Sequence, residues 1–217
     1  MQKKSKTLLQ CDFDGTVTVE DVSFLLLDRF ASGDWRKIHD KYEARKIPVG
    51  EFNRNVFGMV TASRKELVDY MRGRFILRDG LPELVHTCSD LGIRLVIVSN
   101  GLDFYIEEIL TDLKLKGVEF HAAETVFDPR GLKVRYLSPE GKEIIDGFKE
   151  AYMKLFLRDG YRTIYVGNGS SDFPAAKLAH EIYAIDSLLR QCREANVKCS
   201  FFRDLREIAE SLRVNYK

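Results

Sequence analysis

The sequence predicts an α/β protein in which a parallel sheet carries helices on both faces. Three short apolar segments, at 6–11, 93–98 and 162–166, are suited to buried strands, and the second is rich in β-branched residues. Each is followed by segments in which apolar residues recur at three- and four-residue spacing, the pattern of an amphipathic helix. Strands that alternate with helices in this way indicate a Rossmann-like core.

The elements can be assigned in order along the chain. Residues 20–75 contain four helical patterns and no strand, with Pro48 and Ser63 suited to helix starts, so they predict a helical cap inserted after the first strand. The core would then comprise residues 1–19 and 76–217. Short strands around the turn "DPRG" predict a small β flap at 118–138. Helices are expected at 82–91, 102–113, 140–158, 173–179, 186–194 and 203–213, and a short strand at 182–185.

Composition excludes several classes of protein. The chain has 217 residues, of which 45% are hydrophobic, enough for one sizeable domain or one domain with an insertion. Its 34 basic and 33 acidic residues give a net charge of +1, which argues against a nucleic-acid binder. The first apolar run is too short for a signal peptide or a membrane span, so we expect a cytoplasmic protein.

Two smaller features concern the start of the chain and its cysteines, and the cysteines support the cytoplasmic expectation. The basic start "MQKKSK" is expected to be a solvated tail. The four cysteines have no CxxC spacing, which favours reduced core thiols over a metal site or a disulfide framework.

Polar residues follow each of the three strands at the point where the strand is expected to end. Asp12 and Asp14 follow the first strand, "SNG" at 99–101 follows the second, and "GNGSSD" at 167–172 follows the third. Parallel strands bring their carboxyl ends to one edge of the sheet, where ligands bind. Carboxylate and amide oxygens suit Mg²⁺, and small-residue loops with free N–H groups suit phosphate oxygens.

Each motif alone is also compatible with an ordinary turn or a helix cap. Their shared position at strand ends favours a single site. There, one aspartate could attack phosphorus and the other could act as general acid and then base.

The motifs "DFDGTVT", "VSNG" and "GNGSSD", with a lysine between the last two, resemble those of the haloacid dehalogenase (HAD) superfamily phosphatases over nearly the whole chain. The helical insertion and "LRDGLPELVHTCSDLGIRLVIVSNG" are similar to the phosphoserine-phosphatase-like branch. Within it, "AAKLAHEIYAIDSLLRQCREANV" is most similar to the methionine-salvage phosphatases, which act on 2-hydroxy-3-keto-5-methylthiopentenyl-1-phosphate.

The resemblance implies a role for each matching residue. Asp12 would be the nucleophile and a Mg²⁺ ligand, and Asp14 the general acid and base, with its carbonyl on the metal. Ser99, Asn100 and Gly101 would bind phosphate. Of the candidate lysines, Lys142, Lys149 and Lys154, we choose Lys149, because it lies 19 residues before Asn168, the spacing of the methionine-salvage enzymes. Its charge would neutralise Asp12 and the phosphoryl oxygens.

One position departs from the family pattern. The family usually has an aspartate as a Mg²⁺ ligand where this chain has Asn168, so we expect weaker metal binding. Asp172 would be the carboxylate that holds a metal-bound water.

Substrate choice is expected to lie in the cap. Asp21 and Arg54 are candidate substrate contacts, although Asp21 could instead cap its helix and Arg54 could be solvated. The expected partner is a small phosphorylated metabolite, with no nucleic acid and no membrane. Two alternatives stay open: a phosphoserine-phosphatase-like enzyme that acts on a phospho-amino acid or phospho-amine, and a weakened protein that only binds a phosphometabolite. The sequence also leaves open whether the chain is a monomer or a homodimer.

Overall fold

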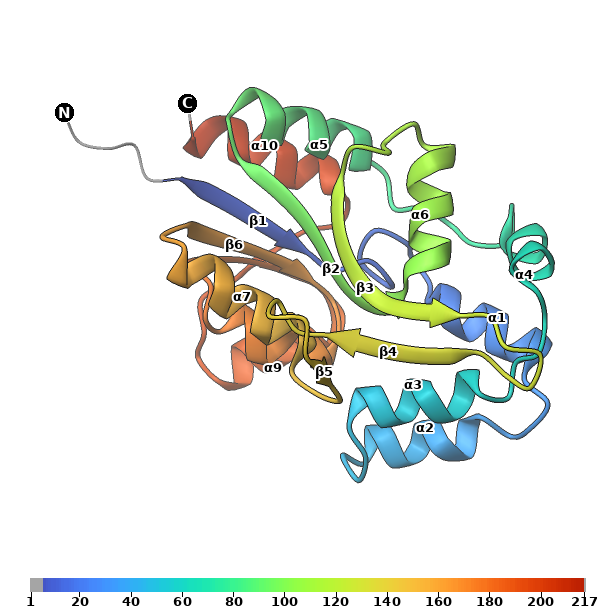
Figure 1. Ribbon diagram of the computed structural model, residues 1–217. Coiled ribbons are helices and arrows are strands. Elements are labelled where there is room, and N and C mark those ends of the chain that lie inside the picture. Colours follow the sequence, from blue (N-terminus) through green and yellow to red (C-terminus); the bar gives the residue numbers. More distant parts are fainter. Residues whose placement is uncertain (1–5, 217) are drawn as a thin grey trace.

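A computed structural model describes residues 6–216 and contains an eight-stranded sheet with strand order β5-β4-β3-β2-β1-β6-β7-β8 (Figure 1). The fully buried strand β1 (Thr7–Cys11) lies between β2 (Arg94–Leu102) and β6 (Arg162–Gly167), and both neighbours are parallel to it. Their carboxyl ends therefore meet at one edge of the sheet. Residues 1–5 of the predicted basic tail lie outside the described residues.

The outer strands extend this centre in both directions. Strand β3 (Glu119–Val126) pairs in parallel with β2, and β7 (Glu181–Ala184) and β8 (Ser200–Phe201) continue the parallel sheet beyond β6. Strands β4 (Lys133–Leu137) and β5 (Glu143–Ile144) add antiparallel pairs to the edge at β3. The strands around "DPRG" thus belong to the main sheet.

Helices cover both faces of the sheet (Figure 1). On one face lie α5 (Leu81–Asp90), α6 (Asp103–Asp112) and α10 (Leu205–Asn215). On the other lie α7 (Phe148–Arg158), α8 (Phe173–Ala176) and α9 (Asp186–Glu194). This arrangement confirms the predicted Rossmann-like α/β core.

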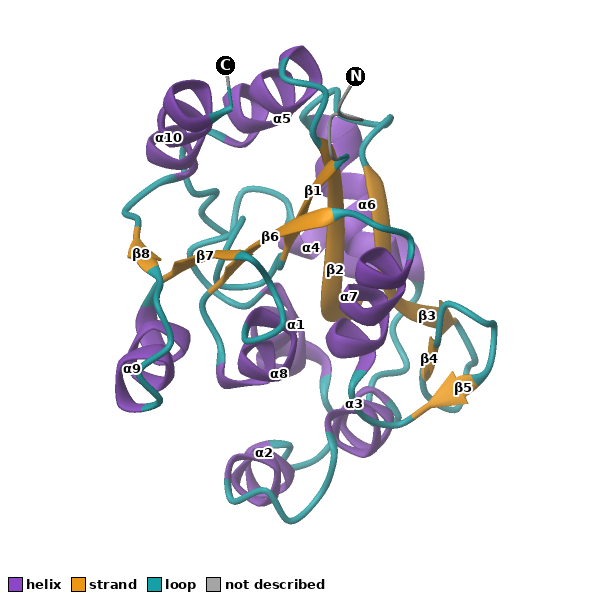
Figure 2. Ribbon diagram, turned by 90° about the vertical axis from the view of Figure 1, so that its left-hand side faces the viewer, coloured by secondary structure: helices purple, strands orange, loops and turns teal. Residues whose placement is uncertain are grey.

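The remaining helices form the segment between β1 and α5: α1 (Val22–Phe30), α2 (Arg36–Glu43), α3 (Val49–Phe57) and α4 (Arg64–Met71). Helix α3 lies beside β4, α2 packs against α3, and α4 lies near α6 (Figures 1 and 2). The chain enters and leaves this segment side by side, through an antiparallel bridge between Thr18 and Leu77. A capping box at Ser63 begins α4, and Pro48 precedes α3, as the sequence indicates.

The structure differs from the sequence prediction at two places that shape the site. Helix α7 begins at Phe148 instead of residue 140, because Gly141 and Gly147 have positive φ values of 75° and 68° and α7 starts after the second. Strand β2 continues through 99–101 to Leu102, with a shift in its pairing between Val98 and Leu102. Such an irregularity re-aims the side chains it contains.

The four cysteines are free thiols, and all but the half-buried Cys199 are buried. Among residues 6–216, no helix is both long and apolar enough to span a membrane.

Candidate active site

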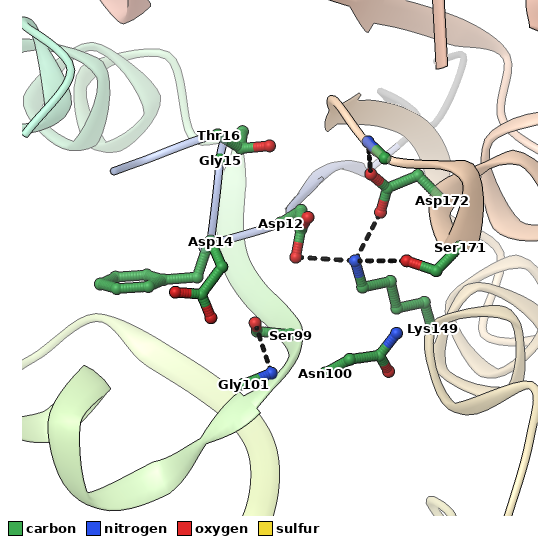
Figure 3. Close-up of polar contacts among 12 residues, drawn as sticks. Asp12, Asp14, Gly15, Thr16, Ser99, Asn100, Gly101, Lys149, Ser171 and Asp172 are labelled. Atoms are coloured by element: carbon green, nitrogen blue, oxygen red, sulfur yellow. Dashed lines mark hydrogen bonds and ion pairs between the residues drawn. The ribbon is translucent and has the colours of Figure 1, made fainter. Parts of the chain in front are cut away.

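Asp12 and Lys149 form a buried ion pair at the carboxyl end of β1. The Lys149 Nζ lies 2.7 Å from Oδ1 of Asp12, and the two side chains are only 4% and 5% exposed (Figure 3). Lys149 occupies the first turn of α7, and its carbonyl accepts a hydrogen bond from the buried side chain of Gln10 on β1. Strand β1 therefore positions the Asp12 carboxylate directly, and it holds the backbone of Lys149 through Gln10. By contrast, Lys142 and Lys154 are exposed.

Asp172 holds the other side of Lys149. Its Oδ1 lies 2.6 Å from the Lys149 Nζ and accepts a second hydrogen bond from the hydroxyl of Tyr165. Its Oδ2 accepts the backbone N–H groups of Asn168 and Gly169, at 3.0 and 2.8 Å. Four protein donors thus surround this fully buried carboxylate, which orients Lys149 and shapes the loop after β6.

Burial dominates the electrostatics of this group. Desolvation, and then the charge of Asp172, raise the pKa of Asp12 to about 7, and Lys149 opposes both effects. Burial alone would lower the pKa of Lys149, but the two carboxylates outweigh it and raise that pKa above its ordinary value. Lys149 is therefore a cation across the physiological range, placed next to Asp12.

Asp14, two residues after Asp12, points to a different side of the site (Figure 3). Its Oδ1 accepts the N–H of Val22, at the start of α1, and its Oδ2 accepts the hydroxyl of Tyr105 on α6. A Cβ at position 101 would lie 2.3 Å from this Oδ2, so Gly101 leaves space for the carboxyl group. Burial and the nearby Asp21 raise the pKa of Asp14. A carboxyl group that holds its proton is suited to donate it.

The residues 99–101 face Asp12 and Asp14 across the same space (Figure 3). The buried Ser99 accepts the backbone N–H of Gly101 through its Oγ at 3.0 Å. This leaves the proton of the Ser99 hydroxyl free to be donated. The Asn100 side chain lies on the side of Lys149.

The Asn168 side chain packs against the turn that follows Asp14. Its Oδ1 accepts the hydroxyl of Thr16 at 3.1 Å, and a Cβ at Gly15 would come within 2.1 Å of its Nδ2. The glycine, with φ of 75°, is thus required for this close approach of the two loops.

These residues fit a hard cation. Oδ1 of Asp12 contacts Lys149, which leaves its Oδ2 for a metal, and Asn168 brings an amide oxygen to the same turn. Between residues 6 and 216, no three His, Cys, Asp or Glu side chains are grouped to hold a metal ion. A metal here would therefore depend on amide and backbone oxygens as well as on Asp12.

The two candidate substrate contacts differ in their distance from this cluster: Asp21 lies close enough to Asp14 to raise its pKa, whereas Arg54 is paired elsewhere. Asp21 caps α1 by accepting the N–H of Phe24. Arg54 pairs with Glu143 at 2.7 Å, and its side chain is 48% exposed. Neither residue lines the cavity beside the site.

That cavity has a volume of about 670 Å³ and opens between the α2–α3 loop and the core. Asn100, Lys149 and Ser171 form its inner wall. The rest of the lining includes apolar side chains such as Tyr42, Val49 and Phe173, together with the cations Arg45, Lys46 and Arg190 and the acidic Glu43, Asp146 and Glu150. A small molecule that reached Lys149 would therefore extend between the α2–α3 loop and the start of α7.

Four buried groups of the site were not identified from the sequence: Gln10, Tyr105, Tyr165 and Thr16. Gln10 lies within the apolar run of β1, which is buried along its whole length, and a buried polar side chain there needs a partner, so this signal was available in the sequence. Tyr105 contacts Asp14 across 91 positions and lies in an apolar helix, and no local pattern marks it.

Comparison with known proteins agrees with this arrangement. Residues 9–177 match the haloacid dehalogenase-like hydrolase family, and the chain belongs to this family.

Curated relatives match along nearly the whole chain. The 2-hydroxy-3-keto-5-methylthiopentenyl-1-phosphate phosphatases of Geobacillus kaustophilus and Brevibacillus brevis are 29% and 26% identical to it, and the matches cover 94% and 95% of both partners. The bifunctional enzyme MtnB/MtnX of Bacillus licheniformis is 28% identical, and the chain spans 49% of that longer protein.

The most similar folds include phosphoserine phosphatases. A phospho-aspartyl intermediate analogue of phosphoserine phosphatase superposes with a TM-score of 0.72 at 20% identity, over 96% of this chain and 99% of that one. A substrate-bound phosphoserine phosphatase gives 0.71 at 21% identity.

Proposed function

We propose that this protein is a Mg²⁺-dependent phosphomonoester hydrolase that acts on a small phosphorylated metabolite through an aspartyl-phosphate intermediate. The observation that carries the proposal is the buried contact between Asp12 and Lys149 at the carboxyl end of β1, with Ser99 and Asp14 around the same space. A nucleophilic carboxylate, a fixed cation and a hydroxyl donor are the groups that phosphoryl transfer needs.

The reaction would proceed in two displacements. Asp12 attacks phosphorus, the bond to the leaving oxygen breaks, and Asp14 gives that oxygen its proton. Water then attacks the phosphoryl group on Asp12, gives a proton to Asp14, and releases phosphate and the free Asp12 carboxylate. Lys149, Ser99 and the backbone of 99–101 would hold the phosphoryl oxygens in both steps.

Mg²⁺ would be held by Asp12, the carbonyl of Asp14 and Asn168. When bound, it would supply a charge that stabilises the phosphoryl oxygens. Asp172 would support the metal site indirectly, because it positions the backbone of Asn168.

Support for the substrate comes from the relatives and the cavity. The matches to 2-hydroxy-3-keto-5-methylthiopentenyl-1-phosphate phosphatases cover about 95% of the chain, and the cavity beside Lys149 has room for a small metabolite. We therefore propose that compound as the candidate substrate. Phosphoserine is less well supported, because the relatives matched over nearly the whole chain carry the other name and Asp21, a candidate substrate contact, accepts the N–H of Phe24 as the cap of α1.

The test is a phosphatase assay with Mg²⁺ against a panel that includes 2-hydroxy-3-keto-5-methylthiopentenyl-1-phosphate, phosphoserine and a chromogenic aryl phosphate. Turnover that disappears in Asp12→Asn, with beryllofluoride bound at Asp12 in the parent protein, supports an enzyme. Absence of turnover on every member of the panel, with phosphate still bound, would instead indicate a binding protein.

A further inference from the structure

Asn53, Tyr136 and the carbonyl of Asn100 form a buried hydrogen-bonded group that joins three separate parts of the fold. Asn53 lies on α3 and Tyr136 on β4, and they are 5% and 2% exposed. The Asn53 Nδ2 donates to the Asn100 carbonyl at 2.9 Å, and the Tyr136 hydroxyl donates to the same oxygen at 2.6 Å. The Nδ2 of Asn53 also donates to the Tyr136 hydroxyl.

The chemistry of these groups determines their roles. A carbonyl oxygen can only accept, so Asn53 must present its NH₂ group, and both of its protons are used. The Tyr136 hydroxyl accepts one bond and donates another. Two donors therefore fill both lone pairs of the Asn100 carbonyl. The donor on α3, Asn53, is buried together with the apolar Phe52, Val56 and Phe57 of the same helix.

The peptide that contains this carbonyl continues into the candidate phosphate loop. The peptide group is planar, so fixing the Asn100 C=O also fixes the N–H of Gly101 at its other end. That N–H donates to Ser99 Oγ at 3.0 Å. With one lone pair of Ser99 Oγ occupied, the hydroxyl rotates about a restricted set of directions, and its proton points away from Gly101.

We infer that Asn53 and Tyr136 are positioning residues that orient the Ser99 hydroxyl toward the phosphoryl group, by fixing the Asn100–Gly101 peptide. This inference rests on the proposed function. It makes the capping helix α3 part of the phosphate site: when α3 is in place, the loop is arranged to bind phosphate. When α3 moves away, the Asn100 carbonyl loses one of its two donors.

Neutral, shape-conserving variants test the inference. Asn53→Leu and Tyr136→Phe each remove donors without adding a charge near phosphate. Each should weaken the binding of inorganic phosphate, measured by calorimetry, and lower kcat/KM, both by about 3- to 10-fold, the range expected for one hydrogen bond. The matched controls are Asn55→Leu, at an exposed position of the same helix, and Tyr152→Phe, whose hydroxyl contacts the carbonyl of Leu137.

A double-mutant cycle separates positioning from a purely structural role. In a Ser99→Ala background the hydroxyl to be oriented is absent, so Tyr136→Phe should cause no further loss of phosphate affinity, measured by the stabilisation that phosphate gives against heat. The inference is overturned if Tyr136→Phe lowers phosphate affinity equally in the parent and in Ser99→Ala. It is also overturned if Tyr136→Phe leaves the affinity of the parent, which retains Ser99, unchanged. Should Asn53→Leu fail to fold, Tyr136→Phe still decides, because it removes a single hydroxyl.

Failure of the proposed function would be recognised separately. A parent protein that neither hydrolyses phosphomonoesters nor binds phosphate would overturn both proposals. A parent protein that does both, with variants equal to it, would overturn this inference alone.

Discussion

The hydroxyl of Tyr105 donates a hydrogen bond to Oδ2 of Asp14, and thereby joins the core helix α6 to the loop after β1. Tyr105 is completely buried, and its hydroxyl also contacts Ser23 at the start of α1. A donor to a carboxylate favours the charged form and lowers its pKa. Tyr105 thus moderates the rise that burial imposes on the pKa of Asp14.

Tyr105→Phe should change the pH profile of the enzyme. Without this donor the pKa of Asp14 rises further, so the proposed general acid keeps its proton to higher pH. The basic limb of kcat/KM should move to higher pH, and kcat should fall by about 3- to 10-fold from the lost orientation. Tyr183→Phe, a buried hydroxyl that contacts Glu181 and Ser211, is the control. A uniform loss of rate at every pH would show that Tyr105 has only a structural role.

Lys149→Met should destabilise the protein as well as abolish turnover. It leaves Asp12 and Asp172 as buried carboxylates without a cation, and breaking a buried pair costs about 3–5 kcal/mol. The pKa of Asp12, already raised to about 7 in the parent, then rises further, because Lys149 no longer opposes the effect of burial. The protonated form of Asp12 is accommodated at low pH, and stability falls as pH rises through the folded-state pKa.

The measurement is urea unfolding at pH 5 and pH 8. The deficit of Lys149→Met against the parent should be larger at pH 8. Lys154→Met on the same helix removes an exposed lysine that pairs with Glu150 at 2.7 Å, and should change stability by no more than about 0.5 kcal/mol. Equal deficits at the two pH values would contradict the proposed charge balance.

Much of the site can be predicted because its residues follow strands directly. Asp12 comes immediately after an apolar run, and the parallel order of β1, β2 and β6 brings the other two loops beside it. Lys149 could be chosen only by resemblance, since Lys142 and Lys154 carry the same charge nearby. What separates them is burial, which depends on where α7 starts, and the predicted start at 140 was wrong by eight residues.

The groups that orient the site could not be predicted. Tyr105, Tyr136 and Asn53 contact the loops across 91, 36 and 47 positions, from a helix, a strand and a capping helix. Their local patterns indicate packing only, and the hydroxyl or amide meets its partner through tertiary structure. The two-residue strands β5 and β8 were missed for a similar reason, because they are defined by their neighbours in the sheet.

Residues 20–75 should move as a lid, with hinges near 18–20 and 77–80. The two connecting segments are paired by hydrogen bonds from Val19 N to the Ile76 carbonyl and from Arg78 N to the Val17 carbonyl. Helix α4 is tied to α6 by exposed ion pairs, such as Arg64 with Glu107, and each such pair contributes only about 0–1 kcal/mol. These exposed pairs oppose movement only weakly, so the cost of opening lies in the buried contacts that α3 makes with β4 and with the Asn100 carbonyl.

Amide hydrogen exchange with and without beryllofluoride tests the lid. Binding should slow exchange in α3 and in the α2–α3 loop, where the lid meets the cavity, and leave the central strand β1 unchanged. If exchange in α3 is as slow in the free protein as in the bound one, and crystal structures of the two states superpose, residues 20–75 are a fixed part of the core.

Asn168→Asp should strengthen the binding of Mg²⁺. The Asn168 side chain lies against the turn at Gly15, and its amide oxygen carries no charge to offset that of a cation. An aspartate there adds the missing negative charge. The Mg²⁺ concentration that gives half-maximal activity should therefore fall by a factor on the order of 10. Without metal, the new carboxylate would add a negative charge to the residue whose backbone N–H already bonds the buried Asp172, so in EDTA the variant should melt at a lower temperature than the parent. Mg²⁺ should then raise its melting temperature by more than it raises that of the parent.

Asn55→Asp, which adds the same charge at an exposed position of α3, should change neither the Mg²⁺ requirement nor the metal-dependent stabilisation. If Asn168→Asp leaves both the Mg²⁺ requirement and the metal-dependent stabilisation unchanged, then position 168 does not contact the metal, and the cation must be held by Asp12 and backbone oxygens alone.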